Sequence, residues 1–294
     1  MKRVVLGFTA ALLLGLGAAS LVAGEWLTRP VRSVVDAPPA GLDAHAVRID
    51  HGAAQHLAGW YLPGRPGHGA VLLLHGVRGN RLQMLGRARW LQREGIASLL
   101  VDLPSHGESS GERIGFGRLE APAVDAALAW LRERVPGERV GAIGVSLGGA
   151  SLLFAARTPE LDALVVESVY PTIEDAVRDR LTMRLGAPVG RALTPLLLAQ
   201  VPLRLGFGTD ALRPIDAIRS VRAPLLMASG TEDLHTPWPE TEALFAAARA
   251  PKVLWPVPGA AHVDLHAFAP GAYEARLGPW LLGHLRRTPA TPAP

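Results

Sequence analysis

One ten-residue stretch, Val140–Gly149, constrains the fold of this chain more than any other. It reads Val-Gly-Ala-Ile-Gly-Val-Ser-Leu-Gly-Gly, which predicts a short apolar strand, a tight turn and the start of a helix. Ser146 occupies the apex of the turn, with Gly144 two residues before it and Gly148 two residues after it. Because glycine has no Cβ atom, strand and helix can approach closely on both sides of the serine. We therefore expect a strained turn that lifts the Ser146 hydroxyl clear of a sheet.

Apolar strands alternate with helices through most of the chain. Besides the strand that begins at Val140, the pattern predicts strands over residues 70–75, 96–102, 161–168, 223–229 and 252–257, and helices over 82–94, 119–135, 239–248 and 273–285. Continuous apolar runs are typical of parallel strands covered on both faces. The alternation predicts an α/β fold with a mostly parallel, doubly covered sheet. Residues 45–50 and 55–62 predict an antiparallel hairpin at its edge.

Residues 171–214 depart from this rhythm. They combine helical apolar spacing with prolines at Pro188, Pro195 and Pro202. We expect a small helical cap inserted over the sheet. Residues 30–41, rich in proline and alanine, are expected to form a linker.

The composition excludes several classes of function. With 294 residues and 49% hydrophobic content, the chain is long enough for one large domain with a substantial core. The absence of cysteine excludes disulfides, thiolate catalysis and cysteine-ligated zinc. The net charge of +4 comes without a dense basic run, because acidic side chains are interspersed with the arginines. We therefore expect no nucleic-acid partner.

The N-terminus has the pattern of a membrane segment. Lys2 and Arg3 precede residues 4–23, which carry no charge, and Trp26 follows. A spanning helix needs about 20 apolar residues, whereas the core of a cleaved signal usually has about 7–15. We therefore predict a signal-anchor over residues 1–28, which associates the protein with a membrane and places the remainder outside the cytoplasm. The alternatives are an exported protein cleaved near residues 18–20 and a buried helix of a soluble domain.

These boundaries divide the chain into three parts. The N-terminal segment covers residues 1–28, one α/β domain covers 29–288, and a disordered tail covers 289–294.

Chemically active residues follow the predicted strands, where functional groups gather in a parallel sheet. Ser146 needs a general base, because a free hydroxyl is a weak nucleophile. His262 follows the last strand and is expected to reach Ser146 over the edge of the sheet. Asp233 follows the preceding strand and is expected to accept a hydrogen bond from the other nitrogen of the imidazole. The chain order Ser146, Asp233, His262 is the order that this kind of fold uses.

An oxyanion formed at Ser146 needs two hydrogen-bond donors. The backbone N–H of Leu147, at the start of the predicted helix, is one candidate. The second is expected in the turn after the first parallel strand, and Val77 is the residue that fits best.

Several neighbouring residues compete for these roles. Glu232 and Asp264 are alternatives to Asp233, and a metal site formed by His262, Asp264 and His266 is conceivable. His75 and His106 are expected to bond loops beneath the site. His235 and His266 are expected at the surface or at the rim.

Taken together, these motifs resemble the α/β-hydrolase superfamily over residues 69–285. The resemblance covers His75-Gly76, the loop from Asp102 to Ser109, the Gly-x-Ser-x-Gly turn and the loops of Asp233 and His262. It is closest to serine hydrolases with a small helical cap, which include carboxylesterases, thioesterases and serine aminopeptidases. It implies a triad of Ser146, Asp233 and His262 with the Val77 and Leu147 amides as oxyanion hole. The chain departs from relatives at Pro104-Ser105, where they often carry an arginine.

The sequence therefore predicts a serine hydrolase that cleaves a small-molecule carboxylic ester or thioester without a cofactor. One alternative is a serine peptidase that acts on small peptides, which would use acidic cap residues to hold the substrate amine; Glu174, Asp175 and Asp179 are available. The other is a catalytically inactive hydrolase fold that serves as a binding module.

Overall fold

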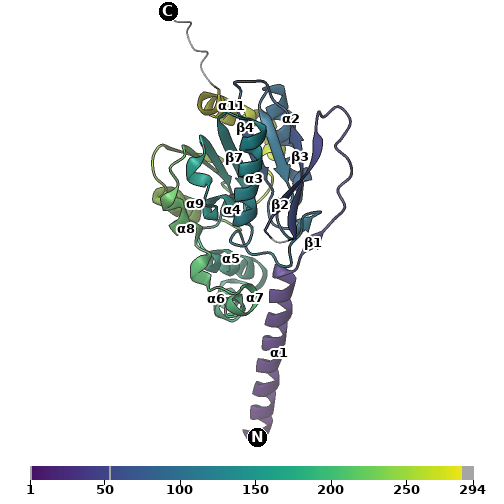
Figure 1. Cartoon of the computed structure of the whole chain (residues 1–294). Helices are drawn as coiled ribbons and strands as arrows, with labels where there is room; N and C mark the ends of the chain where they lie inside the picture. The colour runs from purple at the N-terminus through teal and green to yellow at the C-terminus, as the bar shows by residue number, and fades with distance from the viewer. Residues whose placement is uncertain (1, 53, 287–294) are drawn as a thin grey trace, which may run out of the picture.

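The computed structural model describes residues 2–52 and 54–286, and its core is one twisted sheet (Figure 1). In the described part of the chain the sheet has eight strands in the order β10-β9-β8-β7-β4-β5-β3-β2. All neighbours pair in parallel except β2 with β3 and β3 with β5. The strands are β2 (His45–His51), β3 (Gln55–Leu62), β4 (Ala70–Leu74), β5 (Ala97–Val101), β7 (Val140–Val145), β8 (Ala163–Glu167), β9 (Leu225–Gly230) and β10 (Lys252–Val257). The predicted parallel sheet and its edge hairpin are confirmed.

Helices cover both faces of the sheet, as expected for an α/β fold. Alternate residues of one strand enter different cores: Leu72 of β4 packs into one apolar cluster and Leu73 into the other. The first cluster includes side chains of α3 (Ala121–Arg134), α4 (Leu147–Phe154) and α9 (Trp238–Ala247), with α8 (Pro214–Ala217) beside them. The second includes α2 (Leu85–Arg93), α10 (Leu265–Phe268) and α11 (Pro270–Leu285). Short 3₁₀ turns occur at η1 (Arg81–Met84), η2 (Thr158–Glu160), η3 (Thr209–Ala211) and η4 (Ile218–Ser220).

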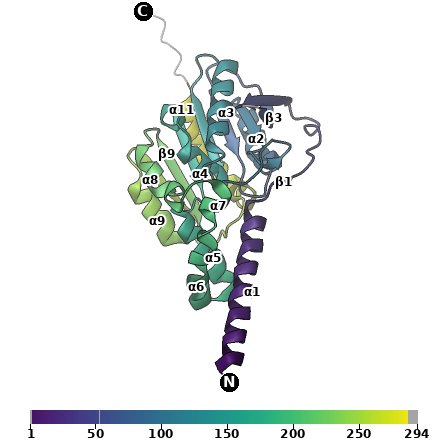
Figure 2. The same cartoon turned by 60° about the horizontal axis from the view of Figure 1, so that its bottom comes forward.

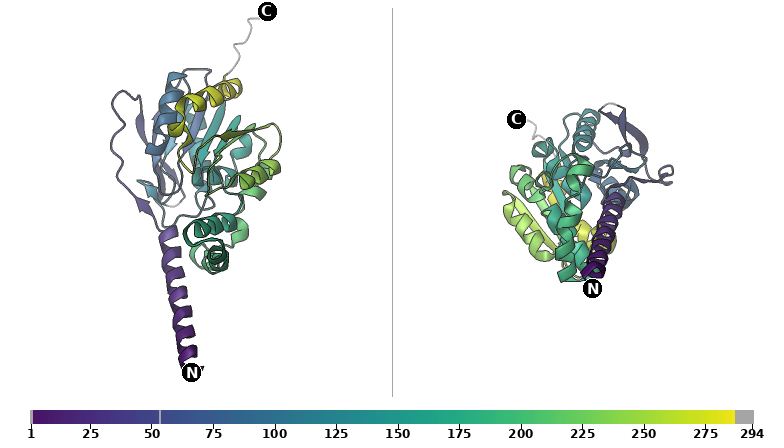
Figure 3. Two further views of the ribbon diagram at one scale, coloured as in Figure 1. Left: turned by 180° about the vertical axis from the view of Figure 1, so that it is seen from behind. Right: turned by 90° about the horizontal axis from the view of Figure 1, so that it is seen from below.

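Residues 171–214 form the predicted helical cap. Its helices are α5 (Ile173–Leu185), α6 (Ala187–Leu198) and α7 (Val201–Leu205). They lie together at one end of the molecule, beside the C-terminal part of α1 (Lys2–Thr28) (Figures 1 and 2). The view from behind shows α1 extending away from the domain at this end (Figure 3).

The expected linker contains a short strand. β1 (Val31–Arg32) pairs in parallel with β6 (His106–Gly107) and joins the segment after α1 to the loop that follows β5. This pairing fixes the chain that leaves α1 against the core of the domain.

The predictions for the two termini have different outcomes. Of the helices in the described residues, none is both long enough and apolar enough to cross a membrane. The membrane anchor predicted for residues 1–28 is therefore not supported. The disordered tail predicted for residues 289–294 lies outside the described residues. The boundary between residues 1–28 and the domain of 29–288 stays a prediction.

Candidate active site

Ser146 lies in the strained turn that the sequence predicts. Its φ angle is 48°, in a region that side chains other than glycine rarely adopt, and its N–H donates to the Glu167 carbonyl over 2.8 Å. The flanking glycines are sterically required. A Cβ atom at Gly144 would lie 2.6 Å from the backbone of Gly148, and one at Gly148 would lie 2.5 Å from the Leu74 carbonyl oxygen. The turn therefore holds Ser146 between β7 and α4 at the edge of the sheet.

Asp233 and His262 are brought together by two loops that follow neighbouring strands. His262 Nδ1 lies 2.7 Å from Asp233 Oδ2. The Asp233 carboxylate is buried, and it also accepts bonds from the His235 and Thr236 N–H groups and from the Thr236 hydroxyl. Burial opposes ionisation, but the hydrogen bond and charge of His262 and the bonds from Thr236 outweigh it and lower the pKa of Asp233. An ionised Asp233 is suited to orient the imidazole.

Within the described residues, no hydrogen bond joins the Ser146 hydroxyl to His262. Hydrogen bonds between catalytic groups are often long in ligand-free proteins and shorten when substrate binds. The structure thus places the predicted acid and base in contact and leaves the contact between base and nucleophile open.

The two backbone N–H groups predicted to bind an oxyanion have no other acceptor among the described residues. Neither the Val77 nor the Leu147 N–H donates to another group in the described part of the chain. The turn that carries Val77 lies close to Ser146, because a Cβ atom at Gly76 would be 3.8 Å from the Ser146 Cβ. The side-chain oxygen of Gln83 accepts the Gly76 N–H over 2.8 Å and so fixes the start of this turn.

His75 and His106 bond the loops beneath the site, as expected. His75 Nε2 accepts from the Leu103 N–H over 2.9 Å, and His106 Nε2 accepts from the Arg78 N–H over 3.1 Å. Burial lowers the pKa of each histidine to about 4, so both are neutral near pH 7. They act as hydrogen-bonding groups and not as charges.

Arg81 supplies the guanidinium group that Pro104-Ser105 lacks. Its backbone N–H donates to Asp102 Oδ1 over 2.7 Å and its Nη1 donates to Asp102 Oδ2 over 2.5 Å. Its Nη2 contacts the Glu108 carboxylate. The loop after β5 therefore keeps its hydrogen bonds with an arginine from η1, a residue that the sequence analysis missed.

A second missed residue, Arg87, joins β8 to the loop of His262. Its guanidinium is fully buried, and its Nη2 donates to Glu167 Oε2 over 2.6 Å. Its Nη1 donates to Asp264 over 2.8 Å, and its Nε lies 3.0 Å from the Tyr273 hydroxyl. The available signal was a charged residue within the apolar helical spacing of Met84, Ala88 and Leu91.

The competing residues have other environments. Glu232 is exposed, and Asp264 binds Arg87 and caps α10, so neither takes the place of Asp233. His266 was expected at the surface, but this was wrong: it is only 8% exposed and contacts Glu274, because α11 packs over it.

The set His262, Asp264 and His266 is not brought together as a metal site. Among the described residues, the group close enough to share an ion is Asp233, His235 and His262, whose ligand atoms lie within 4.8 Å. Both oxygens of Asp233 already accept hydrogen bonds, so they fit the orienting role better than metal ligation.

Comparison with known proteins identifies the superfamily of the chain. The model of the family described as serine aminopeptidase, S33, matches residues 65–207, which contain Ser146 but neither Asp233 nor His262. A Mycobacterium tuberculosis protein named "Uncharacterized protein Rv2307c" is 33% identical over 239 residues, covering 80% of this chain and 77% of the relative. This chain belongs to the α/β-hydrolase superfamily. The α/β-hydrolase is also 26% identical to the Salmonella typhi protein YfhR over 77% of each chain.

Solved structures share the fold of this α/β-hydrolase. The Pyrococcus furiosus esterase Pf2001 superposes with a TM-score of 0.73 at 22% identity, over 89% of this chain and 99% of that one. A protein described as a membrane phospholipase A superposes with a TM-score of 0.58 at 20% identity, over 96% and 99% of the two chains. At such identities the likeness concerns the fold alone.

Proposed function

We propose that the protein is a serine hydrolase that cleaves carboxylic esters or thioesters through an acyl-enzyme on Ser146. The observation that carries the proposal is the strained Ser146 turn together with the backbone N–H groups of Val77 and Leu147, which have no acceptor among the described residues. A strained nucleophile next to two free donors is the arrangement that acyl transfer requires. The pair formed by His262 and Asp233 supplies the base.

In the proposed mechanism, His262 Nε2 takes the proton of the Ser146 hydroxyl as the oxygen attacks the carbonyl carbon of the substrate. Asp233 holds the other nitrogen of the ring and stabilises the imidazolium. The amides of Val77 and Leu147 donate to the tetrahedral oxyanion, each contributing about 3 kcal/mol in the transition state. His262 then protonates the leaving alcohol or thiol, and a water activated by the same histidine hydrolyses the acyl-enzyme.

A serine peptidase is the second candidate, because the matching family is that of the serine aminopeptidases, S33. Such an enzyme would need a free carboxylate to hold the substrate amine. Asp175 and Asp179 are both bound by Arg178, at 2.6 and 3.3 Å. Glu174 keeps one carboxylate oxygen buried without a hydrogen-bond partner. Asp179 Oδ2 is also buried and has no hydrogen-bond partner among the described residues, so these two oxygens are the cap's candidates for binding an amine.

Hydrolysis assays on the full-length protein distinguish the candidates. A series of p-nitrophenyl esters of increasing acyl length, an acyl thioester and an aminoacyl-arylamide form the substrate set. We expect ester or thioester hydrolysis, which Ser146→Ala should reduce to background, since loss of the nucleophile costs on the order of 10⁶-fold in kcat. Ser98→Ala is the control, because this buried serine has no hydrogen-bond partner.

Three other outcomes would contradict the proposal. Preferred cleavage of the arylamide would favour the peptidase. No turnover of any substrate would favour an inactive binding module. Full ester hydrolysis by Ser146→Ala would exclude the acyl-enzyme on Ser146.

A further inference from the structure

The last two turns of α1 pack tightly against the cap. Gln200 Nε2 donates to the carbonyl and hydroxyl oxygens of Ser20 over 2.9 and 2.7 Å, and Arg204 Nη2 donates to the Leu21 carbonyl over 2.6 Å. The helices approach closely at Gly24, where a Cβ atom would lie 2.5 Å from Gln200 Oε1 and 2.8 Å from Arg204 Nε. A larger residue at this position would require the ends of the Gln200 and Arg204 side chains to move.

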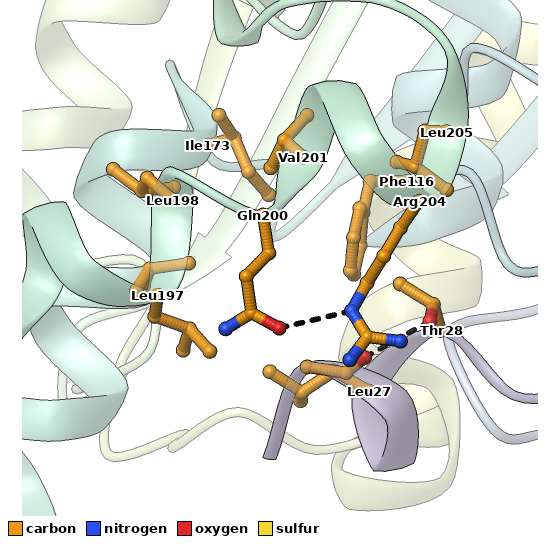
Figure 4. Close-up of a pocket in the computed structure, with 12 residues that line it drawn as sticks. Leu27, Thr28, Phe116, Ile173, Leu197, Leu198, Gln200, Val201, Arg204 and Leu205 are labelled. Carbon is orange, nitrogen blue, oxygen red and sulfur yellow. Dashed lines mark hydrogen bonds between the residues drawn. The ribbon is translucent and has the colours of Figure 1, made fainter. Parts of the chain in front are cut away.

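Apolar side chains of α1 and the cap face one another beside these bonds. They enclose a small cavity lined by Leu27, Ile173, Val177, Leu197, Leu198 and Val201, among others (Figure 4). Gln200 and Arg204 are bonded to each other over 3.0 Å along its polar side (Figure 4). The end of α1 is therefore one wall of an interface between helices.

Glu25 connects the cap to the core of the domain. Its carboxylate accepts from Arg204 Nη1 of α7 over 2.5 Å and from Arg113 Nη1 over 3.1 Å. The two guanidinium groups lower the pKa of Glu25, so it stays ionised at neutral pH. One turn further on, the Thr28 carbonyl accepts the Ile114 N–H over 2.7 Å. The end of α1 thus binds both the cap, through Arg204, and the loop that follows β6, through Arg113 and Ile114.

Trp26 reaches the turn that holds the proposed oxyanion donor. The Arg78 guanidinium lies over the Trp26 ring, 4.2 Å from its centroid, and its Nη1 donates to the Trp26 carbonyl over 3.2 Å. Arg78 directly follows Val77 and has a φ angle of 63°, a costly conformation for a residue with a side chain. Its N–H donates to His106. The hydrogen bond of its N–H with His106 and the contacts of its guanidinium with Trp26 therefore both hold Arg78 in this conformation.

We propose that the end of α1 positions the oxyanion turn, with Trp26 holding Arg78 and thereby the Val77 N–H beside Ser146. Trp26 and Arg78 are positioning residues, since neither side chain is assigned a contact with the substrate. The proposal rests on the proposed function, because it concerns the same oxyanion hole. It assigns residues 20–28 to the catalytic domain and moves the domain boundary toward the N-terminus from residue 29.

The test compares three full-length variants in the hydrolysis of one neutral ester. Trp26→Ala should lower kcat about tenfold and change KM by less than about twofold, because the oxyanion forms only in the transition state. A displaced donor should cost less than a deleted one, which costs about 10²–10³-fold. Trp26→Phe keeps an aromatic face for the guanidinium and should restore kcat to within about threefold of the wild type. Trp130→Ala, which removes a ring stacked under Arg134 at 4.9 Å on α3, is the matched control and should leave kcat unchanged.

A double-mutant cycle separates positioning from loss of stability. Arg78→Ala should lower kcat by about the same factor as Trp26→Ala, and the double variant should be no worse than either, because both remove one interaction. Thermal unfolding midpoints identify any variant that fails to fold. If Trp26→Ala fails to fold, the kcat of Trp26→Phe is compared with that of the wild type instead.

Three results would overturn the inference: unchanged kcat in Trp26→Ala, an equal fall in Trp130→Ala, or multiplicative effects in the double variant. Failure of the proposed function gives a different result, namely an ester hydrolysis that is absent in the wild type or persists in Ser146→Ala. Ester hydrolysis that depends on Ser146 and is indifferent to Trp26 would refute only the role of α1.

Discussion

Arg87, which is fully buried, and Asp264, which is partly exposed, form an ion pair of 2.8 Å that connects α2 to the loop of His262. Asp264 stands two residues after His262, and Arg87 also binds Glu167, whose carbonyl accepts the Ser146 N–H. His262 and Ser146 are therefore joined through α2, in addition to the direct contact of His262 with the Asp233 loop. Both connections fix the position of the histidine loop relative to the Ser146 turn.

Arg87→Met should destabilise the protein by about 3–5 kcal/mol. The substitution leaves the fully buried Glu167 carboxylate without its cation, and breaking a buried pair costs this much because the remaining charge is uncompensated. Urea unfolding measures the loss. Arg93→Met is the matched control, because Arg93 also joins α2 to α11 but is 61% exposed, so its loss should cost less than about 1 kcal/mol. Equal effects of the two substitutions would contradict the role given to Arg87.

Gly148→Ala should disrupt the turn of Ser146. The new Cβ atom would lie 2.5 Å from the Leu74 carbonyl oxygen and 2.8 Å from that of His75, and neither backbone atom can move without distorting β4. We expect a loss of about 3 kcal/mol or more in the free energy of unfolding. Gly283→Ala in α11 is the control: it meets no atom within 4 Å and should stabilise the helix by about 0.5–1 kcal/mol. If both substitutions lowered the free energy of unfolding, or both raised it, the steric role given to Gly148 would be wrong.

Asp233→Asn should lower kcat for ester hydrolysis by about 10⁴-fold with little change in folding. An amide in place of the carboxylate no longer stabilises the imidazolium and favours the wrong tautomer of His262. Steady-state kinetics measure the loss. The neighbouring Glu232→Gln removes an exposed carboxylate and should leave kcat unchanged. If Glu232→Gln were the more damaging change, the assignment of Asp233 would be wrong.

The stability of the protein should depend on the neutral state of His75. Its pKa is lowered by burial to about 4 in the folded state, compared with about 6.5 when unfolded. Between pH 6.5 and 4 the unfolded chain therefore binds more protons at this site, so His75 makes the folded state less stable as the pH falls. His75→Asn should make the decline of the free energy of unfolding shallower by about 1.4 kcal/mol per pH unit in this window. Chemical denaturation across this range tests it, and parallel curves for variant and wild type would contradict the assignment.

The sequence analysis predicted the strand order along the chain and the loops of Ser146, Asp233 and His262. This was possible because apolar runs mark buried strands and because parallel strands end at a common edge. The contact between Asp233 and His262 follows from that geometry.

The sequence pattern did not predict the buried ion pairs of Arg87 and Arg81. Arg87 and Glu167 are 80 positions apart, and their pairing depends on how α2 lies over β8. The contact of Arg81 with Asp102 was likewise not predicted, because the two residues are 21 positions apart and lie on different segments.

The role of α1 was not predicted for a related reason. Residues 4–23 indicated a membrane segment because they carry no charge over a length of about 20 residues, and this pattern does not show which contacts the end of the helix makes. The contacts of residues 20–28, among them those of Gly24, Glu25 and Trp26, show a helix end that packs on the domain.

Labelling with a fluorophosphonate tests the central claim most directly, because the reagent forms a stable adduct with an activated serine. The account predicts one adduct per chain, located by mass spectrometry on the peptide that contains Ser146, with ester hydrolysis lost in proportion to labelling. Ser146→Ala should take up no reagent. An adduct at another residue, or full hydrolysis by the completely labelled protein, would contradict the account.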